Sequence, residues 1–191
     1  MIQFIPSPNF SSRGSLKPEV IVLHIMLGSM GGTIEWFKQR RSQVSSHYLV
    51  AKDGRVVQMV RDNHTAWHAG KIVEPSNRAI MLLKKQGQRY INPNLYSLGI
   101  ECEAKAGETW TPKQMDALVE LVKMIGKKYQ MSLDKDHIIT HRDITRHKPD
   151  MEKWYQEVMR RVQRKEREKE DNSSEEKEAI KRQIIDLLNK L

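Results

Sequence analysis

Hydrophobic and polar positions along the first 150 residues follow patterns that predict several buried strands. Residues 20–23 (VIVL) form a short continuous apolar run, as in a strand buried on both faces. Residues 97–104 (SLGIECEA) alternate instead, which places Gly99, Glu101 and Glu103 on the face opposite the apolar side chains. Two strands of a central sheet are therefore expected in these segments.

A long helix is predicted over residues 111–130 (TPKQMDALVELVKMIGKKYQ). Thr111 is a suitable N-cap, Pro112 fits the first turn, and Gln114 completes a capping box. Apolar positions then recur at helical spacing and define a buried stripe. The stripe consists of Met115, Leu118, Val122, Ile125 and Tyr129.

The remaining patterns complete an alternation of strands and helices. Residues 45–60 contain two strand-like runs around Asp53-Gly54, which is a hairpin signal. Residues 137–140 (HIIT) form another short strand that ends at His141. Alternating strands and helices favour an α/β fold with a mixed central sheet flanked by helices. No internal repeat is present.

The pattern changes near residue 152, which divides the chain into a domain at 1–152 and a charged helical C-terminal extension at 153–191. Trp154, Tyr155, Val158 and Val162 predict a helix that docks on the domain. Residues 165–176 (KEREKEDNSSEE) contain no apolar residue and are typical of a solvated helix end and a linker.

The last residues carry a second helical stripe. Its apolar positions are Ile180, Ile184, Leu187 and Leu191. This helix is too short to be stable alone in water, so it needs a partner surface. Charges of both signs argue against membrane binding, and no stable membrane insertion is expected. We expect packing on the domain, homo-oligomer formation or contact with the cell envelope.

Composition narrows the function classes. The formal net charge is +9, of which +8 lies on the first 150 residues, which hold 22 Lys and Arg against 14 Asp and Glu. A basic globular surface favours a polyanionic partner, either nucleic acid or a phosphate-rich cell wall. No secretory signal and no membrane-spanning run is present, which predicts cytoplasmic synthesis. The single cysteine, Cys102, excludes an internal disulfide, and its apolar neighbours favour an inert buried thiol.

Two histidines and one carboxylate are candidate metal ligands. His24 and His141 each follow an apolar strand, and Asp150 lies nine residues beyond His141. Zinc accepts imidazole and carboxylate ligands, and three protein ligands leave a fourth position for water. The spacing alone is weak evidence, because a histidine at a strand end is more often a hydrogen-bonded core residue.

Several motifs, in this order, resemble the family of zinc-dependent phage lysozyme-type N-acetylmuramoyl-L-alanine amidases. The motifs are IVLH, SSHYLVAKDGRVVQMV, AWHAG, SLGIECE, TPKQMDALVELV and HRDI followed by KPD. Peptidoglycan recognition proteins and cytosolic muropeptide-recycling amidases share the family's fold. The resemblance covers residues 20 to about 150 and does not extend over 152–191.

The resemblance implies a role for particular residues. It makes His24, His141 and Asp150 the zinc ligands, with Zn2+ as the cofactor. Glu101 matches the carboxylate that acts on the zinc-bound water, and Lys148 matches the cation that steadies the developing oxyanion. Two further residues, Trp67 and His68, match the segment that lines the peptidoglycan groove.

The chain departs from the family pattern at several positions. Ser46 stands where some phage members have a tyrosine, which increases the role expected of Glu101. Ile25 replaces a second histidine after the first ligand, and Thr140 replaces a common glycine. Met151 and Glu152 replace a Pro-Gly pair. These departures concern the shape of the last ligand loop, and hence Asp150 more than the two histidines.

The resemblance implies an amidase that cuts the bond between N-acetylmuramic acid and L-alanine in peptidoglycan. The basic domain favours a bacteriolytic phage endolysin that acts on the wall after release from the host cytoplasm. A cytosolic recycling amidase and a non-catalytic peptidoglycan-binding module are the alternatives. Charge alone suggests nucleic acid, and no recognisable nucleic-acid-binding motif supports that partner.

Overall fold

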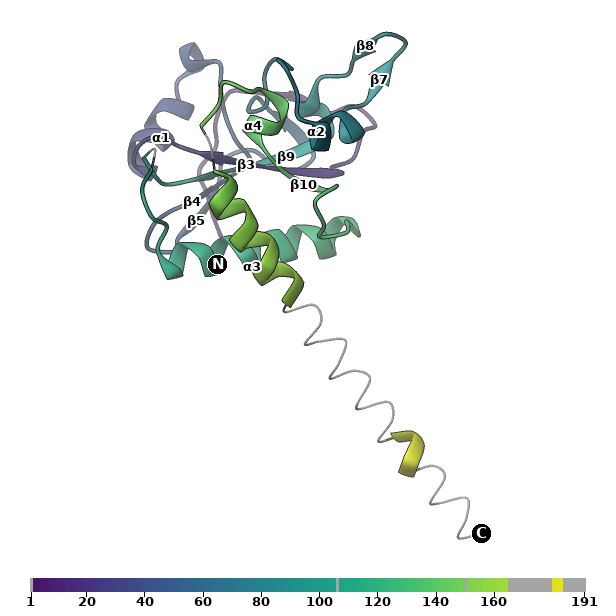
Figure 1. The fold of residues 1–191 in the computed structure, drawn as a ribbon. Coiled ribbons are helices and arrows are strands. Elements are labelled where there is room, and N and C mark those ends of the chain that lie inside the picture. Colours follow the sequence, from purple (N-terminus) through teal and green to yellow (C-terminus); the bar gives the residue numbers. More distant parts are fainter. Residues whose placement is uncertain (1, 106, 150, 165–179, 184–191) are drawn as a thin grey trace.

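The fold is built on a six-stranded sheet (Figure 1) in a computed structural model that describes residues 2–105, 107–149, 151–164 and 180–183. The strand order is β1-β5-β4-β9-β3-β10. These strands are β1 (Gln3–Phe4), β3 (Val20–Ile25), β4 (Tyr48–Val50), β5 (Val56–Gln58), β9 (Ser97–Cys102) and β10 (Ile138–Thr140). Two small sheets pair β2 (Phe10–Ser12) with β6 (His64–Ala66) and β7 (Lys85–Gln86) with β8 (Arg89–Tyr90).

Helices cover both faces of the six-stranded sheet, as Figure 1 shows. The helices are α1 (Met30–Phe37), α2 (Asn77–Leu82), α3 (Pro112–Tyr129) and α4 (His141–Ile144), with short 3₁₀ helices η1 (Arg40–Ser42) and η2 (Pro93–Leu95). Residues 152–164 and 180–183 are also helical. Strands β4, β9, β3 and β10 run parallel and β5 is antiparallel to β4, so the predicted mixed α/β sheet is confirmed.

One face of the sheet is packed mainly with apolar side chains. Leu98, Ile100 and Cys102 of β9 point to this face, where α3 and residues 152–164 cover them. The predicted docking helix is therefore present, and the hydroxyl of Tyr155 donates a 2.9 Å hydrogen bond to the carbonyl of Ile138. Cys102 is fully buried, and burial raises the pKa of its thiol well above the ordinary value, as an inert thiol requires.

The opposite face carries two separate apolar clusters. One joins Val20 and Val22 of β3 to α2 and α4, and the other joins Leu49 of β4 to α1. His24 continues the β3 face that carries Val20 and Val22, while Glu101 lies on the corresponding face of β9. Polar side chains therefore fill the space between two hydrophobic clusters.

Local structure departs from the predicted pattern at two helices. Thr111 caps α3 by accepting from the backbone N–H of Gln114, but the Gln114 side chain does not complete the capping box. Its amide instead donates to the carbonyls of Val50 and Glu103, where it ties α3 to the sheet.

Helix α1 was not predicted because Gly31 and Gly32 disfavour a helix. The side chain of its N-cap residue, Ser29, holds the first turn.

A buried carboxylate links α3 to the sheet on the packed face. The side chain of Asp62 is 3% exposed and accepts hydrogen bonds from Tyr48, Gln58, Lys128 and Tyr129. Burial alone would raise the pKa of Asp62, but the hydrogen bonds outweigh burial and hold the pKa below its ordinary value. Because the folded pKa is depressed, this carboxylate stabilises the fold above its unfolded pKa, and the stabilisation is lost as the pH falls through the folded value.

Asp62→Asn should lower the free energy of unfolding at pH 7 by about 1–3 kcal/mol, because the buried Tyr48 hydroxyl and the Lys128 ammonium lose a charged acceptor. The difference from the parent should shrink below pH 4, where protonation removes the same charge. Urea unfolding at pH 7 and pH 3 measures both values. The exposed Asp136→Asn is the control. An equal deficit at both pH values would contradict the linkage.

The C-terminal extension lies largely outside the described residues. Residues 165–179, which include the predicted linker at 165–176, are not described, and neither are the last three positions of the second stripe, Ile184, Leu187 and Leu191. Ile180 is described and is 57% exposed. Within the described part of the chain, no helix is both long and apolar enough to cross a membrane.

Candidate functional site

Parallel pairing brings three distant segments to one edge of the sheet. His24 on β3 is the register partner of Glu101 on β9, and Leu23 pairs with Thr140 on β10. His141, the residue after Thr140, therefore follows its strand at the same level as His24. The carboxyl ends of parallel strands are the usual ligand-binding edge of an α/β sheet.

A capping box fixes the point where β10 becomes α4. Thr140 accepts from the backbone N–H of Asp143, and the Asp143 carboxylate accepts from the backbone N–H and hydroxyl of Thr140. Asp143 is buried and also accepts from Ser76 and Arg78. Threonine at the position of the common glycine thus has a structural role, because it starts the helix that carries His141.

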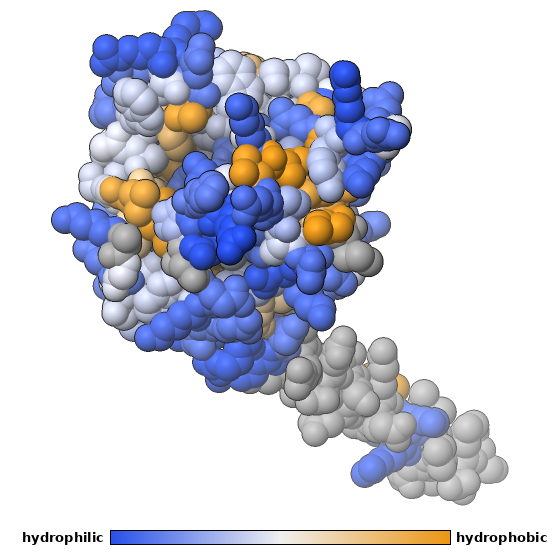
Figure 2. All heavy atoms as spheres, turned by 45° about the horizontal axis from the view of Figure 1, so that its top comes forward, coloured by the Kyte–Doolittle hydropathy of each residue, from blue (hydrophilic) through white to orange (hydrophobic). Residues whose placement is uncertain are grey.

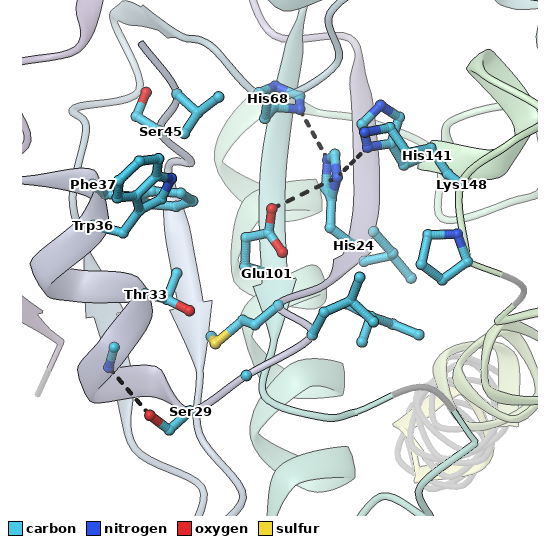
Figure 3. Close-up of a pocket in the computed structure, with 18 of the residues that line it drawn as sticks. His24, Ser29, Thr33, Trp36, Phe37, Ser45, His68, Glu101, His141 and Lys148 are labelled. Carbon is cyan, nitrogen blue, oxygen red and sulfur yellow. Dashed lines mark hydrogen bonds and ion pairs between the residues drawn. The ribbon is translucent and has the colours of Figure 1, made fainter. Parts of the chain in front are cut away.

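The two histidines turn the same ring nitrogen toward each other. Nδ1 of His24 lies 2.9 Å from Nδ1 of His141, and 3.8 Å from a carboxylate oxygen of Glu101 (Figure 3). Burial, and then the neighbouring cationic and imidazole groups, hold the pKa of His24 well below its ordinary value. Burial and Lys148 lower the pKa of His141 to about 4, against a backbone hydrogen bond at Ala69 that raises it. Both imidazoles are therefore neutral near pH 7.

Neutral imidazoles with converging nitrogens have the chemistry of a zinc donor pair. Two imidazoles on one tetrahedral zinc ion, each bound at about 2.0–2.1 Å, would have their nitrogens about 3.3 Å apart. The observed separation of 2.9 Å between His24 and His141 is within a few tenths of an ångström of that value. These two residues fit a zinc site.

The third predicted ligand, Asp150, lies outside the described residues, although its neighbours Pro149 and Met151 line the same pocket. Among the residues that the structure does describe, no group of three or more His, Cys, Asp or Glu side chains forms a metal-binding cluster. The zinc set therefore remains a prediction, with two of its three members brought together.

Glu101 and Lys148 contribute opposite charges to the same pocket. The Glu101 side chain is 13% exposed, and burial raises its pKa to about 7, against a lowering effect of the Lys148 ammonium. A carboxyl group with such a pKa can take up and return a proton near neutral pH. Lys148 is exposed in the loop after α4, and its charge is also felt by both histidines.

The pocket has a volume of about 460 Å³ and extends from the histidines to α1. Its far wall contains Thr33, Trp36 and Phe37 of α1 together with Ser45 (Figure 3). Trp36 is 46% exposed. The face of the molecule seen in Figure 2 is mostly hydrophilic, with separate hydrophobic areas. An open pocket with an apolar wall and a polar end suits an amphiphilic substrate.

Both predicted groove residues, Trp67 and His68, line the pocket, but their contacts differ. Trp67 lines the pocket, and its indole N–H donates to the hydroxyl of Ser11. His68 is 7% exposed and lies behind His24, with its Nδ1 3.0 Å from Nε2 of His24. Ser46 is fully buried and does not enter the pocket lining.

Sequence reasoning did not single out Ser97, or the α1 wall of the pocket. Ser97 and Gly99 share the face of β9 that carries Glu101, and Ser97 lies 3.2 Å from Nε2 of His68. A side chain at Gly99 would meet the His68 ring at 2.5 Å. Ser97 and Gly99 are small residues on the strand face opposite Leu98 and Ile100. A small residue in a strand often marks a place where another side chain approaches closely, so the sequence did contain a signal for this contact.

Comparisons with known proteins point to one family. N-acetylmuramoyl-L-alanine amidase A of Achromobacter lyticus is 34% identical over 122 residues, which are 62% of this chain and 56% of that protein. The 1,6-anhydro-N-acetylmuramyl-L-alanine amidase AmpD of Haemophilus influenzae is 34% identical over 103 residues, which are 54% of this chain and 48% of that protein. The chain thus spans about half the length of these curated relatives.

Solved structures agree on the fold. The N-acetylmuramoyl-L-alanine amidase LysC of Clostridium intestinale superposes with a TM-score of 0.63 at 20% identity, covering 85% of this chain and 97% of that one. The family of N-acetylmuramoyl-L-alanine amidases matches residues 14–153, a stretch that includes every strand of the site and all the candidate site residues. This chain belongs to the N-acetylmuramoyl-L-alanine amidase family.

Proposed function

We propose that the protein is a zinc-dependent hydrolase of the amide bond between N-acetylmuramic acid and L-alanine in peptidoglycan. The observation that carries this proposal is the convergence of His24 and His141 beside Glu101 at one end of an open pocket. Membership of the amidase family supports the same bond.

His24 and His141, together with Asp150, would hold the metal ion. Bound zinc would lower the pKa of a water molecule and polarise the scissile carbonyl. Glu101 then accepts the proton of the attacking water and passes it to the leaving amine of L-alanine. The ammonium of Lys148 stabilises the negative charge that develops on the carbonyl oxygen. Trp67 and the α1 wall contact the glycan or the stem peptide.

Mass spectrometry of digested peptidoglycan tests this function directly. Purified sacculi incubated with the full chain should yield intact glycan strands and free peptides that begin with L-alanine. A chelator should stop the release, and added zinc should restore it. Binding to sacculi without any new amino terminus would instead identify a non-catalytic recognition module. Cleavage within the glycan or between stem residues would overturn the proposal.

The biological role that we propose is that of a phage endolysin made in the host cytoplasm. The net charge of +9 supports attraction to a polymeric anionic wall. The relative from Haemophilus influenzae is named for a 1,6-anhydro-muramyl substrate, which favours a muropeptide-recycling role as the second candidate. Rates on intact sacculi and on soluble anhydro-muropeptides separate the two roles, since a recycling enzyme should prefer the soluble substrate.

Lys148→Met should lower kcat about 10²-fold while KM and zinc content stay near the parent values. The substitution keeps the length of the side chain and removes the cation that stabilises the oxyanion. Kinetics on a soluble muropeptide, with metal analysis of the same sample, measure both effects. The neighbouring exposed His147→Gln is the control. An unchanged kcat would remove Lys148 from the chemistry.

Deleting residues 172–191 should leave zinc binding and the hydrolysis of soluble muropeptides intact. The deleted segment carries the apolar stripe that needs a partner surface, so oligomer size, lysis of whole cells or both should fall. Light scattering and turbidity of treated cells measure these effects. A truncated chain with the parent's mass and lytic activity would show that the segment serves neither self-association nor envelope contact.

A further inference from the structure

A buried chain of hydrogen bonds runs from His24 away from the pocket. Nε2 of His24 lies 3.0 Å from Nδ1 of His68, and Nε2 of His68 lies 3.2 Å from the hydroxyl of Ser97. That hydroxyl lies 2.7 Å from the backbone carbonyl of Pro93. His24, His68 and Ser97 are 4%, 7% and 0% exposed, so bulk water does not compete for these bonds.

The carbonyl at the end of the chain determines the direction of each bond. A carbonyl oxygen only accepts, so the Ser97 hydroxyl must donate its one hydrogen to Pro93. The Ser97 oxygen can then only accept, and Nε2 of His68 must carry the hydrogen that it receives. In the neutral ring, Nδ1 of His68 is therefore an acceptor, and Nε2 of His24 must donate to it.

We propose that His68 is a positioning residue that places the proton of His24 on Nε2 and leaves the lone pair on Nδ1, the atom that faces His141. The wiring follows from the donors and acceptors of the chain alone. It turns two lone pairs toward each other at 2.9 Å, an arrangement that suits a shared cation and is not a hydrogen bond. Its consequence for zinc affinity rests on the proposed function. This role is additional to the groove-lining one that the sequence suggested for His68, which also lines the pocket.

The surroundings of His68 hold the ring in the orientation that this role needs. The backbone N–H groups of His68 and Ala69 both donate to the side chain of Asn94, one residue from Pro93. Gly99 leaves space for the ring, since a Cβ there would meet it at 2.5 Å. The segment from η2 into β9 thus supplies the acceptor, the backbone anchor and the space for one imidazole.

The second ligand candidate has a matching arrangement. A backbone hydrogen bond at Ala69 raises the pKa of His141, which is the effect of a carbonyl that accepts from a ring N–H. Because Nδ1 of His141 faces His24, the ring nitrogen left to donate to the backbone at Ala69 is Nε2. Residues 68 and 69 therefore orient both imidazoles, through the ring of His68 and the backbone of Ala69.

Long-range ¹H–¹⁵N NMR of the metal-free full chain, labelled at histidine nitrogens, reads the tautomers without any assay of activity. His24 is expected to show a protonated Nε2 and an unprotonated Nδ1, and His68 is expected to show the same. Single substitutions assign the signals. A proton on Nδ1 of His24 in the unsubstituted chain would overturn the proposal.

Matched variants separate the hydrogen bond from the packing. His68→Asn keeps a carbonyl oxygen where Nδ1 stands, whereas His68→Phe keeps the bulk and removes the acceptor. We expect His68→Phe to mix the two tautomers of His24 and to weaken zinc binding about 10- to 100-fold, with His68→Asn close to the parent. Calorimetric titration with zinc measures the affinity, and His137→Phe, at the other end of β10, is the control.

Ser97→Ala provides a second test in case His68→Phe does not fold. It removes the acceptor of the His68 proton with little change in volume, and His24 should again show both tautomers. An unchanged His24 tautomer in both variants would refute the positioning role. If the unsubstituted chain has the expected tautomers but binds no zinc, the wiring stands and the proposed metal site fails, so the two failures are distinguishable.

Discussion

Alanine in place of His24 should abolish stoichiometric zinc binding and lower amide hydrolysis by about 10³-fold or more. The imidazole provides one of two converging nitrogens, and the activation of water depends on the metal that they would hold. His141→Ala should have the same effect, because one remaining imidazole and the predicted ligand Asp150 cannot keep the ion in place. Metal analysis after dialysis, combined with muropeptide kinetics, measures both quantities.

The control for this pair is His137→Ala. His137 precedes β10 and bonds to Asp134, at the end of the strand remote from the pocket. Zinc content and activity of His137→Ala should stay at the parent level, and circular dichroism should show that all three variants are folded. Full zinc occupancy in both His24→Ala and His141→Ala would exclude the site. Asp150→Ala should also weaken zinc binding, and a normal affinity would assign the third ligand elsewhere.

Glu101→Gln should lower kcat by about 10²- to 10⁴-fold, the range typical of a lost general base. Glutamine has nearly the same shape, and it cannot accept the proton of the attacking water. Zinc content should remain near the parent value, because Glu101 lies beside the two imidazoles and is not one of the three predicted zinc ligands. Near-normal turnover would remove Glu101 from the mechanism.

Stability gives an independent check on the same variant. Burial raises the pKa of Glu101 to about 7, so the folded state disfavours the charged form. A carboxyl group whose pKa is raised by folding stabilises the folded state at low pH. This stabilisation is lost as the pH rises through the pKa of the group in the folded state. Metal-free Glu101→Gln should therefore melt at the parent temperature near pH 5 and no lower than the parent at pH 8. The exposed Glu120→Gln on α3 is the control, with unchanged activity. A large fall in melting temperature would indicate a structural role.

Local pattern alone was sufficient for the elements that build the sheet and its main helix. The apolar run at 20–23 and the alternation at 97–104 predicted β3 and β9, since strand periodicity depends on neighbouring residues. The helical period and Thr111 predicted α3 and its N-cap. Helix α1 was missed because Gly31 and Gly32 lower intrinsic helix propensity, and the packing of Met30 and Phe37 compensates for it.

The candidate site, like the fold, could be predicted from the sequence only in part. Motif order indicated His24, Glu101 and His141 as residue types suited to hydrolysis, and the resemblance gave them roles. Their meeting is a matter of strand pairing, because the register of β3 against β9 and β10 sets which side chains share a level. No local pattern encodes a register between strands so far apart along the chain.

The sequence by itself determined the family, the α/β class and the side chains available for chemistry. Tertiary structure decided which nitrogen of each imidazole faces the pocket, and it placed His68 behind His24 as well as in the lining of the pocket. It also revealed Ser97 and Gly99 as the residues that support His68. The physical reason is that proton placement depends on the donor and acceptor at the end of a hydrogen-bond chain, and that chain joins segments that meet only in the folded protein.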